Sequence, residues 1–315
     1  MENKKYMKGE EFVEKLLLGE RDFSNIKLEE GFDLSKSEKF EELKNYLAKQ
    51  NFKNEPITME NSELKYINMG NIYLPYLYGN KTNFEGANLS GACLKNANLS
   101  KAILEDACLT EANLRRANLF GANLAGANLK RADLSGANLC EATLEEACLE
   151  EANLERANLK KTCFVCANLQ RASFLKAKLL EADLSEANIQ NANFKSASLC
   201  RAVLYGANLE AAILIRTNFK EANLIGANLE KANLERANFR RAILHNANLE
   251  EVNAECADFR KATLSGANLQ NGNFRCANLK RANLKDANLT GADLEGATIE
   301  YVFIGGNKYI FIVEW

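Results

Sequence analysis

The sequence predicts an all-β solenoid, a fold in which the chain turns a corner every five residues and stacks on itself. The first observation is a five-residue repeat that runs without insertion from Thr82-Asn83-Phe84 to Ala297-Thr298-Ile299 and has 44 central positions. The second is that its apolar residues lie two positions apart, whereas a helical stripe needs spacings of three and four. In such a repeat protein, the length of 315 residues does not predict the number of domains.

Each repeat is expected to direct two side chains inward. These are the small residue and the Leu or Phe two positions later, while the other three side chains face water. Four such sides close a square coil of twenty residues, and coils stack at the spacing of about 4.8 Å between hydrogen-bonded strands. Weaker copies extend the phase back to Met59 and forward to Ile304, which makes 50 repeats and about twelve coils.

The run of Ala-(Asn/Asp)-Leu-x-x units, such as Ala87-Asn88-Leu89, resembles the pentapeptide-repeat family. The resemblance covers about 250 of the 315 residues and implies a right-handed quadrilateral β-helix. It implies no single function, because the motif of this family is the scaffold itself. The Asn between the two inward residues is expected to bond the backbone of the turns.

Departures from the pattern are expected to compensate one another in the core. Val252 takes the place of Ala and Ala254 that of Leu within one repeat, and the next coil has Gly272 with Phe274. A larger residue is thus offset by a smaller one, as a close-packed interior requires. Three further phenylalanines lie twenty residues apart and are expected to stack as an internal ladder: Phe219, Phe239 and Phe259.

The amino-terminal end of the coil stack needs a cover, because it would otherwise expose apolar side chains. Residues 1–56 are predicted to form a small α-helical N-terminal cap. One helix contains the apolar residues of 12–17, and a second follows Ser35 and Glu38, which have the spacing of a capping box. Between the helices, residues 21–28 look like a partial first coil.

The carboxyl-terminal end is expected to use a different device. The β-helix is predicted over residues 57–304, and residues 305–315 contain a strongly apolar, β-prone strand that ends at Trp315. This strand is expected either to fold over the last coil or to form a twofold dimer contact. The resemblance bears on the second alternative, because family members that act on topoisomerases dimerise through their carboxyl-terminal ends, although typically with a helix that is not seen in this sequence. The protein is therefore a monomer or a C-terminal homodimer.

The outward charges differ from side to side, although the net charge is only −2. Every fourth repeat lies on the same side, so the charges of a side can be summed over all coils. From the side centred on Phe84 onward, the sums are −7, −3, +3 and +7. We expect two acidic and two basic sides.

Six cations on three successive coils form the basic patch. Like charges stacked in register repel one another, which favours a contact with an anionic partner, either an acidic protein surface or a nucleic-acid backbone. A solvated side, partly neutralised by nearby acids, is the alternative. No exposed aromatic residues accompany these cations, which disfavours single-strand stacking. The basic patch comprises Arg240, Arg241, Arg260, Lys261, Lys280 and Arg281.

Acidic residues suggest a second functional class. By resemblance, some pentapeptide-repeat proteins match duplex DNA in width and negative charge and bind DNA gyrase in its place. A DNA-mimic regulator of gyrase or topoisomerase is therefore the alternative function, although the basic sides depart from an all-round mimic. The acidic strip that supports it comprises Glu105, Asp106, Glu145, Glu146, Glu150 and Glu151.

The cysteines and the single histidine do not indicate an enzyme. The lone C-x-x-C of Cys163 and Cys166 has no second pair, so a zinc site is not expected. Cys256 and Cys276 occupy equivalent corners of adjacent coils, so their Cα atoms are expected near 4.8 Å, which is within disulfide range. His245 has no Ser or Cys arranged around it. We expect no catalytic residue, no metal and no cofactor.

These observations favour a non-enzymatic scaffold that binds another macromolecule, with an unknown protein as the partner. The amino terminus is polar where a signal peptide would be apolar, and no apolar run reaches the ~18 residues of a membrane helix. Nine irregularly spaced cysteines make a poor disulfide framework. A cytoplasmic location without a membrane span is expected.

Overall fold

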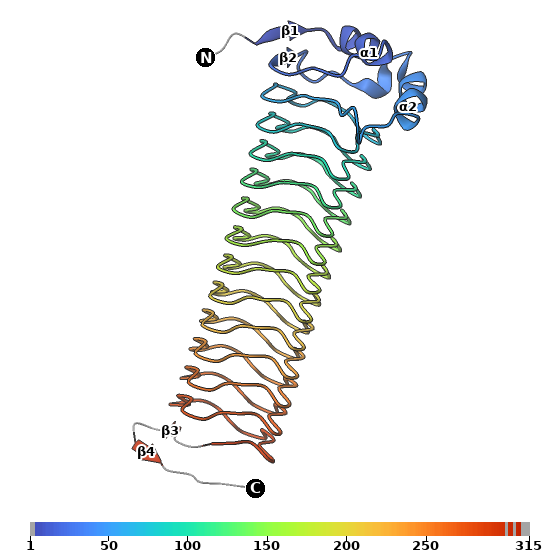
Figure 1. Cartoon of the computed structure of the whole chain (residues 1–315). Coiled ribbons are helices and arrows are strands. Elements are labelled where there is room, and N and C mark those ends of the chain that lie inside the picture. The colour runs from blue at the N-terminus through green and yellow to red at the C-terminus, as the bar shows by residue number, and fades with distance from the viewer. Residues whose placement is uncertain (1–3, 300–301, 305–306, 310–315) are drawn as a thin grey trace. The chain divides into compact units, whose positions relative to one another are not determined.

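The computed structural model describes residues 4–299, 302–304 and 307–309. The chain forms two compact units, Met1–Asn158 and Leu159–Trp315. In both units, parallel bridges join residues twenty positions apart, as between Asn83 and Ile103 in the first unit and between Asn193 and Ile213 in the second. A coil therefore takes twenty residues, so four repeats make its four sides, and each unit is a stack of such coils (Figure 1).

Every backbone N–H group of a typical repeat has an acceptor. In the repeat 87–91 the five groups donate, in order, to the carbonyl oxygens of Phe84 (2.9 Å), Ile67 (2.8 Å) and Cys108 (2.7 Å), to Asn88 Oδ1 (3.1 Å) and to the carbonyl oxygen of Thr110 (2.8 Å). The first of these bonds closes the turn, three join neighbouring coils, and the Asn side chain accepts the remaining one. The expectation that the recurrent Asn bonds the turn backbone is thus confirmed.

The last residue of each repeat has a left-handed backbone. Its φ is 58° at Glu111, 56° at Arg131 and 63° at Gly91. A turn closed by an i to i+3 hydrogen bond with positive φ at its third residue favours Gly or Asn there. Charged residues nevertheless occupy many of these positions. Because Asn tolerates positive φ, a change from Arg or Lys to Asn there removes charge without adding backbone strain.

The inward residues form the core. All inward positions between Ile57 and Leu284 are buried, and Ala and Leu side chains dominate them. Burial weakens in the last described coil, where Ala297 is still buried but five inward side chains are only half-buried: Ala287, Leu289, Ala292, Leu294 and Ile299.

Aromatic rings stack along the core of the second unit. The ring centroids of Phe219 and Phe239 are 4.8 Å apart and those of Phe239 and Phe259 are 4.9 Å apart, with interplanar angles of 9° and 4°. Phe274 meets Phe259 at 5.9 Å in a tilted arrangement. Val252 and Ala254 are both buried, next to the coil that contains Phe274. The rings and the exchanged residues therefore share one interior.

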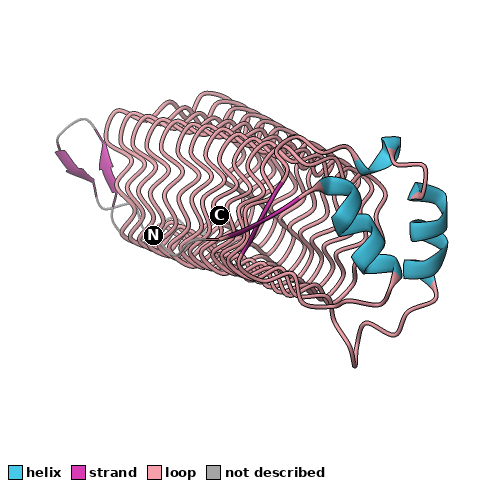
Figure 2. Cartoon of the chain, turned by 90° about the horizontal axis from the view of Figure 1, so that it is seen from above, coloured by secondary structure: helices cyan, strands magenta, loops and turns pink. Residues whose placement is uncertain are grey.

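The amino-terminal part of the first unit contains two helices and a short parallel sheet. Strand β1 (Lys5–Met7) pairs with β2 (Ile26–Leu28), and α1 (Gly9–Leu17) contacts α2 (Phe40–Ala48). Figure 2 shows both helices outside the coils. Bridges from Asp22 to Thr58, from Lys27 to Glu63 and from Asp33 to Asn68 join this segment to the repeats as a first coil.

The second helix begins later than the capping-box spacing predicts, and this part of the prediction is wrong. Helix α2 starts at Phe40 without a side-chain cap, and Ser35 lies in a 3-10 helix, η1 (Leu34–Lys36). The Ser35 hydroxyl and N–H both donate to Asp33 Oδ1, at 2.6 and 3.0 Å. The Ser35 side chain therefore bonds to Asp33 in a local turn and does not cap a helix.

The last repeat of the predicted array adopts another pairing. Strand β3 (Val302–Ile304) is antiparallel to β4 (Asn307–Tyr309), and the last described parallel bridge joins Asn278 to Thr298. Residues 302–304 therefore belong to a hairpin. The rest of the apolar strand, residues 310–315, lies outside the described residues.

Candidate functional site

The basic patch lies entirely in the second unit. Its residues occupy the two turn positions of three successive corners, and backbone bonds such as Lys261 N–H to the Lys280 carbonyl (3.0 Å) hold these corners in register. Five of the cations surround a shallow hollow of about 170 Å³: Arg240, Arg260, Lys261, Lys280 and Arg281. The structure thus brings the predicted cations together.

Acidic neighbours neutralise two members of the patch. Arg260 donates to both carboxylate oxygens of Asp258, with its Nη2 2.6 Å from Oδ2 and its Nε 2.8 Å from Oδ1. Partial burial opposes ionisation of Asp258, but hydrogen bonds from Arg260 lower its pKa below the ordinary value. Arg241 Nη1 lies 3.5 Å from Glu221 Oε1. Within the described residues, the other four cations form no ion pair: Arg240, Lys261, Lys280 and Arg281.

The acidic strip divides into two parts of the first unit. Four carboxylates surround a hollow of about 250 Å³ whose floor is Ala125 and Gly126. Within the part of the chain that the structure describes, none of the four has a salt bridge, although Asn123 Nδ2 donates to Glu105 Oε2 at 3.0 Å. The four acids of this acidic hollow are Glu105, Asp106, Glu145 and Glu146.

The other two acids of the strip are paired. Lys130 Nζ lies 2.8 Å from Glu150 Oε2, and Arg131 Nε lies 2.8 Å from Glu151 Oε2. Both bases stand one coil away from their acids, at the equivalent turn positions. Glu150 and Glu151 therefore carry little free negative charge. Adding the outward charges of each side from the sequence did not reveal this pairing.

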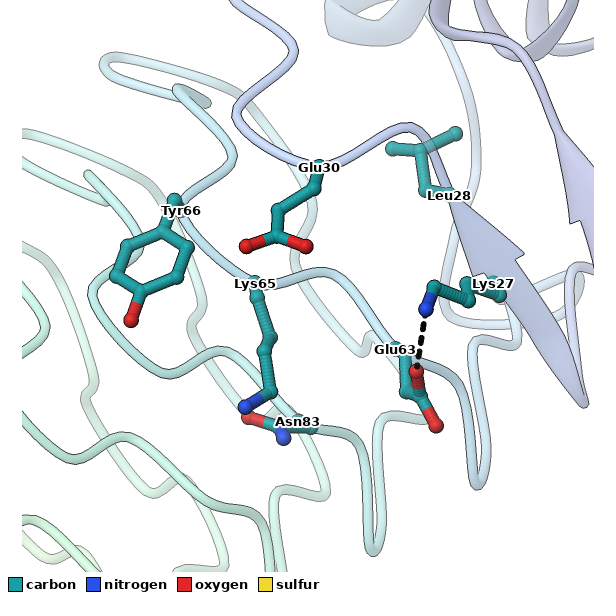
Figure 3. A pocket seen from close by; sticks show the side chains of 7 residues that line it. All are labelled: Lys27, Leu28, Glu30, Glu63, Lys65, Tyr66 and Asn83. Carbon is teal, nitrogen blue, oxygen red and sulfur yellow. Dashed lines mark ion pairs between the residues drawn. The ribbon is translucent and has the colours of Figure 1, made fainter.

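A further hollow of about 480 Å³ lies at the first corner of the first unit (Figure 3). Its lysines are paired: Lys27 Nζ lies 3.9 Å from Glu63 Oε2, and Lys65 Nζ lies 2.7 Å from Glu85 Oε2. The hydrogen bond from Lys65 lowers the pKa of Glu85, and the bond from Tyr66 to the same carboxylate raises the pKa of Tyr66. Its charges thus largely satisfy one another, and sequence analysis had not singled it out.

The thiols of Cys256 and Cys276 are free and exposed. Loss of water around the sulfur and the neighbouring Cys276 thiol raise the pKa of Cys256 above its ordinary value. Both residues have the left-handed backbone of corner positions, with φ of 57° and 56°. The two thiols therefore form a dithiol on adjacent coils, in which the acidity of Cys256 is weakened.

The remaining candidates do not assemble into a reactive site. Cys166 Sγ lies 3.8 Å from Glu186 Oε2. The expectation that no Ser lies around His245 is wrong, because the next coil places Ser265 Oγ 2.9 Å from His245 Nδ1 on the exposed surface. Over the described ranges, no cluster of three His, Cys, Asp or Glu residues could hold a metal ion. None of the helices in these ranges has the length and apolarity needed to cross a bilayer.

These features define a repeat protein whose surface is a set of charged, stacked corners. The family described as "Pentapeptide repeats (8 copies)" matches in overlapping segments that span residues 80–300. The chain belongs to the pentapeptide-repeat family, whose members form right-handed quadrilateral β-helices.

Solved structures give further similarities. HetL, a pentapeptide repeat protein involved in heterocyst differentiation regulation from the cyanobacterium Nostoc sp. strain PCC 7120, is 33% identical, with 78% of this chain and 92% of HetL covered and a TM-score of 0.30. QnrB1, a plasmid-mediated fluoroquinolone resistance protein, is 24% identical over 61% of this chain and 90% of its own, with a TM-score of 0.40. Rfr23 from the cyanobacterium Cyanothece 51142 is 35% identical over 35% of this chain and 62% of its own, with a TM-score of 0.21. A comparison with curated proteins gives no match.

Proposed function

We propose that this protein is a non-enzymatic interaction scaffold whose basic patch binds an acidic surface of a partner protein. The observation that carries the proposal is a set of four cations around one hollow that form no ion pair with any described residue: Arg240, Lys261, Lys280 and Arg281. They repeat at the inter-coil spacing of about 4.8 Å, so their mutual repulsion lowers the stability of the folded chain. A bound acidic surface relieves that repulsion.

The charge pattern elsewhere in the array supports this assignment. At several other corners a base faces an acid one coil away, as in Lys130 with Glu150 and Lys65 with Glu85. Arg201 lies between Glu181 and Glu221 in the same manner, at 3.7 and 3.1 Å. The basic patch departs from this alternation of charge. Its cations therefore stay available to bind an acidic surface of a partner.

The architecture that presents this surface is proposed as about twelve coils, with helices α1 and α2 as an N-terminal cap for the first coil. Phe12 and Leu43 of these helices are buried. Residues 305–315 are proposed to cover the half-buried inward residues of the last described coil, either within one chain or in a homodimer. The free thiols of Cys256 and Cys276 fit a reducing, cytoplasmic location.

A charge-reversal experiment tests the basic patch. The probe is a fluorescent peptide of twelve glutamates, titrated at low and moderate salt. We expect Lys261→Glu/Lys280→Glu to weaken binding at least tenfold. The matched control, Lys130→Glu/Arg131→Glu, changes the net charge equally at corners where the bases are already paired, and we expect a change of less than threefold. Equal losses in both variants would refute a specific patch, and tighter binding of duplex DNA than of the peptide would favour a nucleic-acid partner.

The acidic hollow supports a second function, regulation of DNA gyrase or topoisomerase by DNA mimicry. Four carboxylates without salt bridges in the described residues offer negative charge to a basic DNA-binding groove. The test is gyrase supercoiling with the protein titrated in, with and without a quinolone. Glu145→Gln/Glu146→Gln should abolish inhibition or protection, whereas Glu150→Gln/Glu151→Gln at the paired acids should not. No effect of the wild-type protein at any concentration would exclude this function.

A further inference from the structure

A second cationic hollow lies in the first unit and shares no residue with the basic patch. Its volume is about 330 Å³. Long side chains rise on its two flanking coils, whereas the coil between them contributes only Ser135 and Gly136 at the corner. The missing side-chain volume of these two residues creates the hollow. Its charged walls are Arg115, Arg116, Glu155 and Arg156.

The arginines of this hollow depart from the alternation of charge seen at other corners. Arg116 and Arg156 occupy the same left-handed corner position two coils apart, with Gly136 between them. Arg131, at the equivalent position on another side, instead lies between two acids, 3.7 Å from Glu111 and 2.8 Å from Glu151. Within the described residues Arg116 and Arg156 have no ion pair, and Arg115 has only a distant one, 3.6 Å from Asp133.

Spacing and donors fit one tetrahedral oxyanion. Two inter-coil steps separate the Arg116 and Arg156 backbones by about 9.6 Å, which leaves room for an anion that accepts charge-assisted bonds of about 2.8 Å from both sides. Ser135 lines the same space. Other serines at this position, such as Ser185, donate Oγ to the preceding carboxylate at 2.6 Å. In the described part of the chain, Ser135 bonds to its preceding carboxylate only through its N–H, at 3.0 Å from Asp133 Oδ1.

We propose that this hollow binds a phosphomonoester dianion carried by a phosphorylated serine or threonine of a partner polypeptide. Three guanidinium groups match a dianion and favour bidentate bonds to its oxygens. The hollow is open on a flat side, so an extended segment can lie across it. A nucleic-acid strand fits less well, because its phosphates need a continuous basic track and Glu155 stands on the rim.

The test uses the full chain and a fluorescent Gly/Ser-rich peptide with one phosphoserine, beside its unphosphorylated twin. We expect saturable binding of the phosphopeptide only. Arg116→Asn/Arg156→Asn should weaken it at least tenfold, and Asn suits the left-handed backbone of these positions. Gly136→Asn removes no charge but fills the hollow, and we expect a similar loss. The matched control is Arg131→Asn, which removes an arginine from the same corner position elsewhere and should leave affinity within twofold.

The outcomes separate the sources of the phosphoryl group. Competition by inorganic phosphate at millimolar concentration is expected if the phosphate itself is recognised. If inorganic phosphate bound through Arg116 and Arg156 while the phosphopeptide did not, the site would take a free anion and the polypeptide partner would be excluded. Equal binding of both peptides, or binding insensitive to Arg116→Asn/Arg156→Asn, would overturn the proposal. None of these variants touches the basic patch, so this result is independent of the proposed function.

Discussion

The ring of Phe274 occupies the space that a side chain at Gly272 would need. A Cβ atom added to Gly272 would lie 2.6 Å from Phe274 Cε2 and 3.2 Å from Val252 Cγ2. In each of these two repeats a large residue thus accompanies a small one: Phe274 with Gly272, and Val252 with Ala254. Compensation between neighbouring coils is therefore a steric requirement of this core.

Gly272→Ala should consequently destabilise the second unit by about 1–3 kcal/mol, because overpacking forces a shift of the ring or the backbone. Adding Phe274→Leu to this variant restores the common Ala and Leu pair and should recover most of the loss. Urea unfolding of the single and double variants measures this coupling. Additive effects of the two substitutions would contradict the steric account.

Ser62 links the first coil to the repeats by buried hydrogen bonds. Its Oγ donates to the Phe23 carbonyl at 2.7 Å and accepts from the Ile26 N–H at 3.1 Å. Ser62→Ala should cost about 1–3 kcal/mol, because it leaves buried backbone groups without partners. Urea unfolding measures the cost, and faster hydrogen exchange at the Ile26 amide would locate it. Ser90→Ala, a control at a half-buried outward position, should change stability by less than 0.5 kcal/mol, about the usual limit for surface substitutions; an equal cost in both variants would argue against the linking role.

The dithiol of Cys256 and Cys276 should be cross-linked by a short bifunctional thiol reagent such as dibromobimane. Because the pKa of Cys256 is raised, less of it is thiolate at neutral pH, so its alkylation should be slower than that of an ordinary thiol and should accelerate only at higher pH. Peptide mass spectrometry identifies the linked residues. Cys108 and Cys148, which stand two coils apart with Asn128 between them, should not be linked to each other. Linkage of both pairs would show that the reagent does not report adjacency.

The bond between Asp258 and Arg260 should make stability depend on pH in the acidic range. The pKa of Asp258 is lowered in the folded chain, so its contribution is complete above the unfolded-state pKa of about 3.9. It is lost as the pH falls through the folded-state pKa. Asp258→Asn should therefore be less stable than the wild type at pH 7, with a difference that shrinks as the pH approaches 2. A difference that stayed constant over this range would mean that ionisation of Asp258 does not contribute.

Much of the fold could be predicted because one five-residue period specifies it. The phase of the repeat separates inward from outward residues, and the inward positions from Ile57 to Leu284 are indeed buried. The position of Asn within the repeat identified it as a partner for the turn backbone, since its side chain reaches an N–H two residues on. The stacked rings of Phe219 and Phe239 follow from their separation of twenty residues.

The ends were less predictable, because no repeat constrains them. Ser35 could either cap a helix or bond to the nearby Asp33 carboxylate. In the structure its N–H and hydroxyl both bond to Asp33. Residues 302–304 fit the repeat phase but pair with the strand that follows them. Local competition of this kind depends on chain segments whose positions a periodic pattern does not specify.

The sequence by itself determined the coil, its four sides, the buried positions and the sign of the charge at every corner. Only the tertiary structure decided which charges remain available. Glu150 and Glu151 belong to an acidic strip by sequence, yet bases one coil away neutralise them, whereas Arg116 and Arg156 line one hollow with Gly136 between them in the stack. The physical reason is that a charge in a stacked coil interacts mainly with residues twenty positions away, at distances set by side-chain length and rotamer.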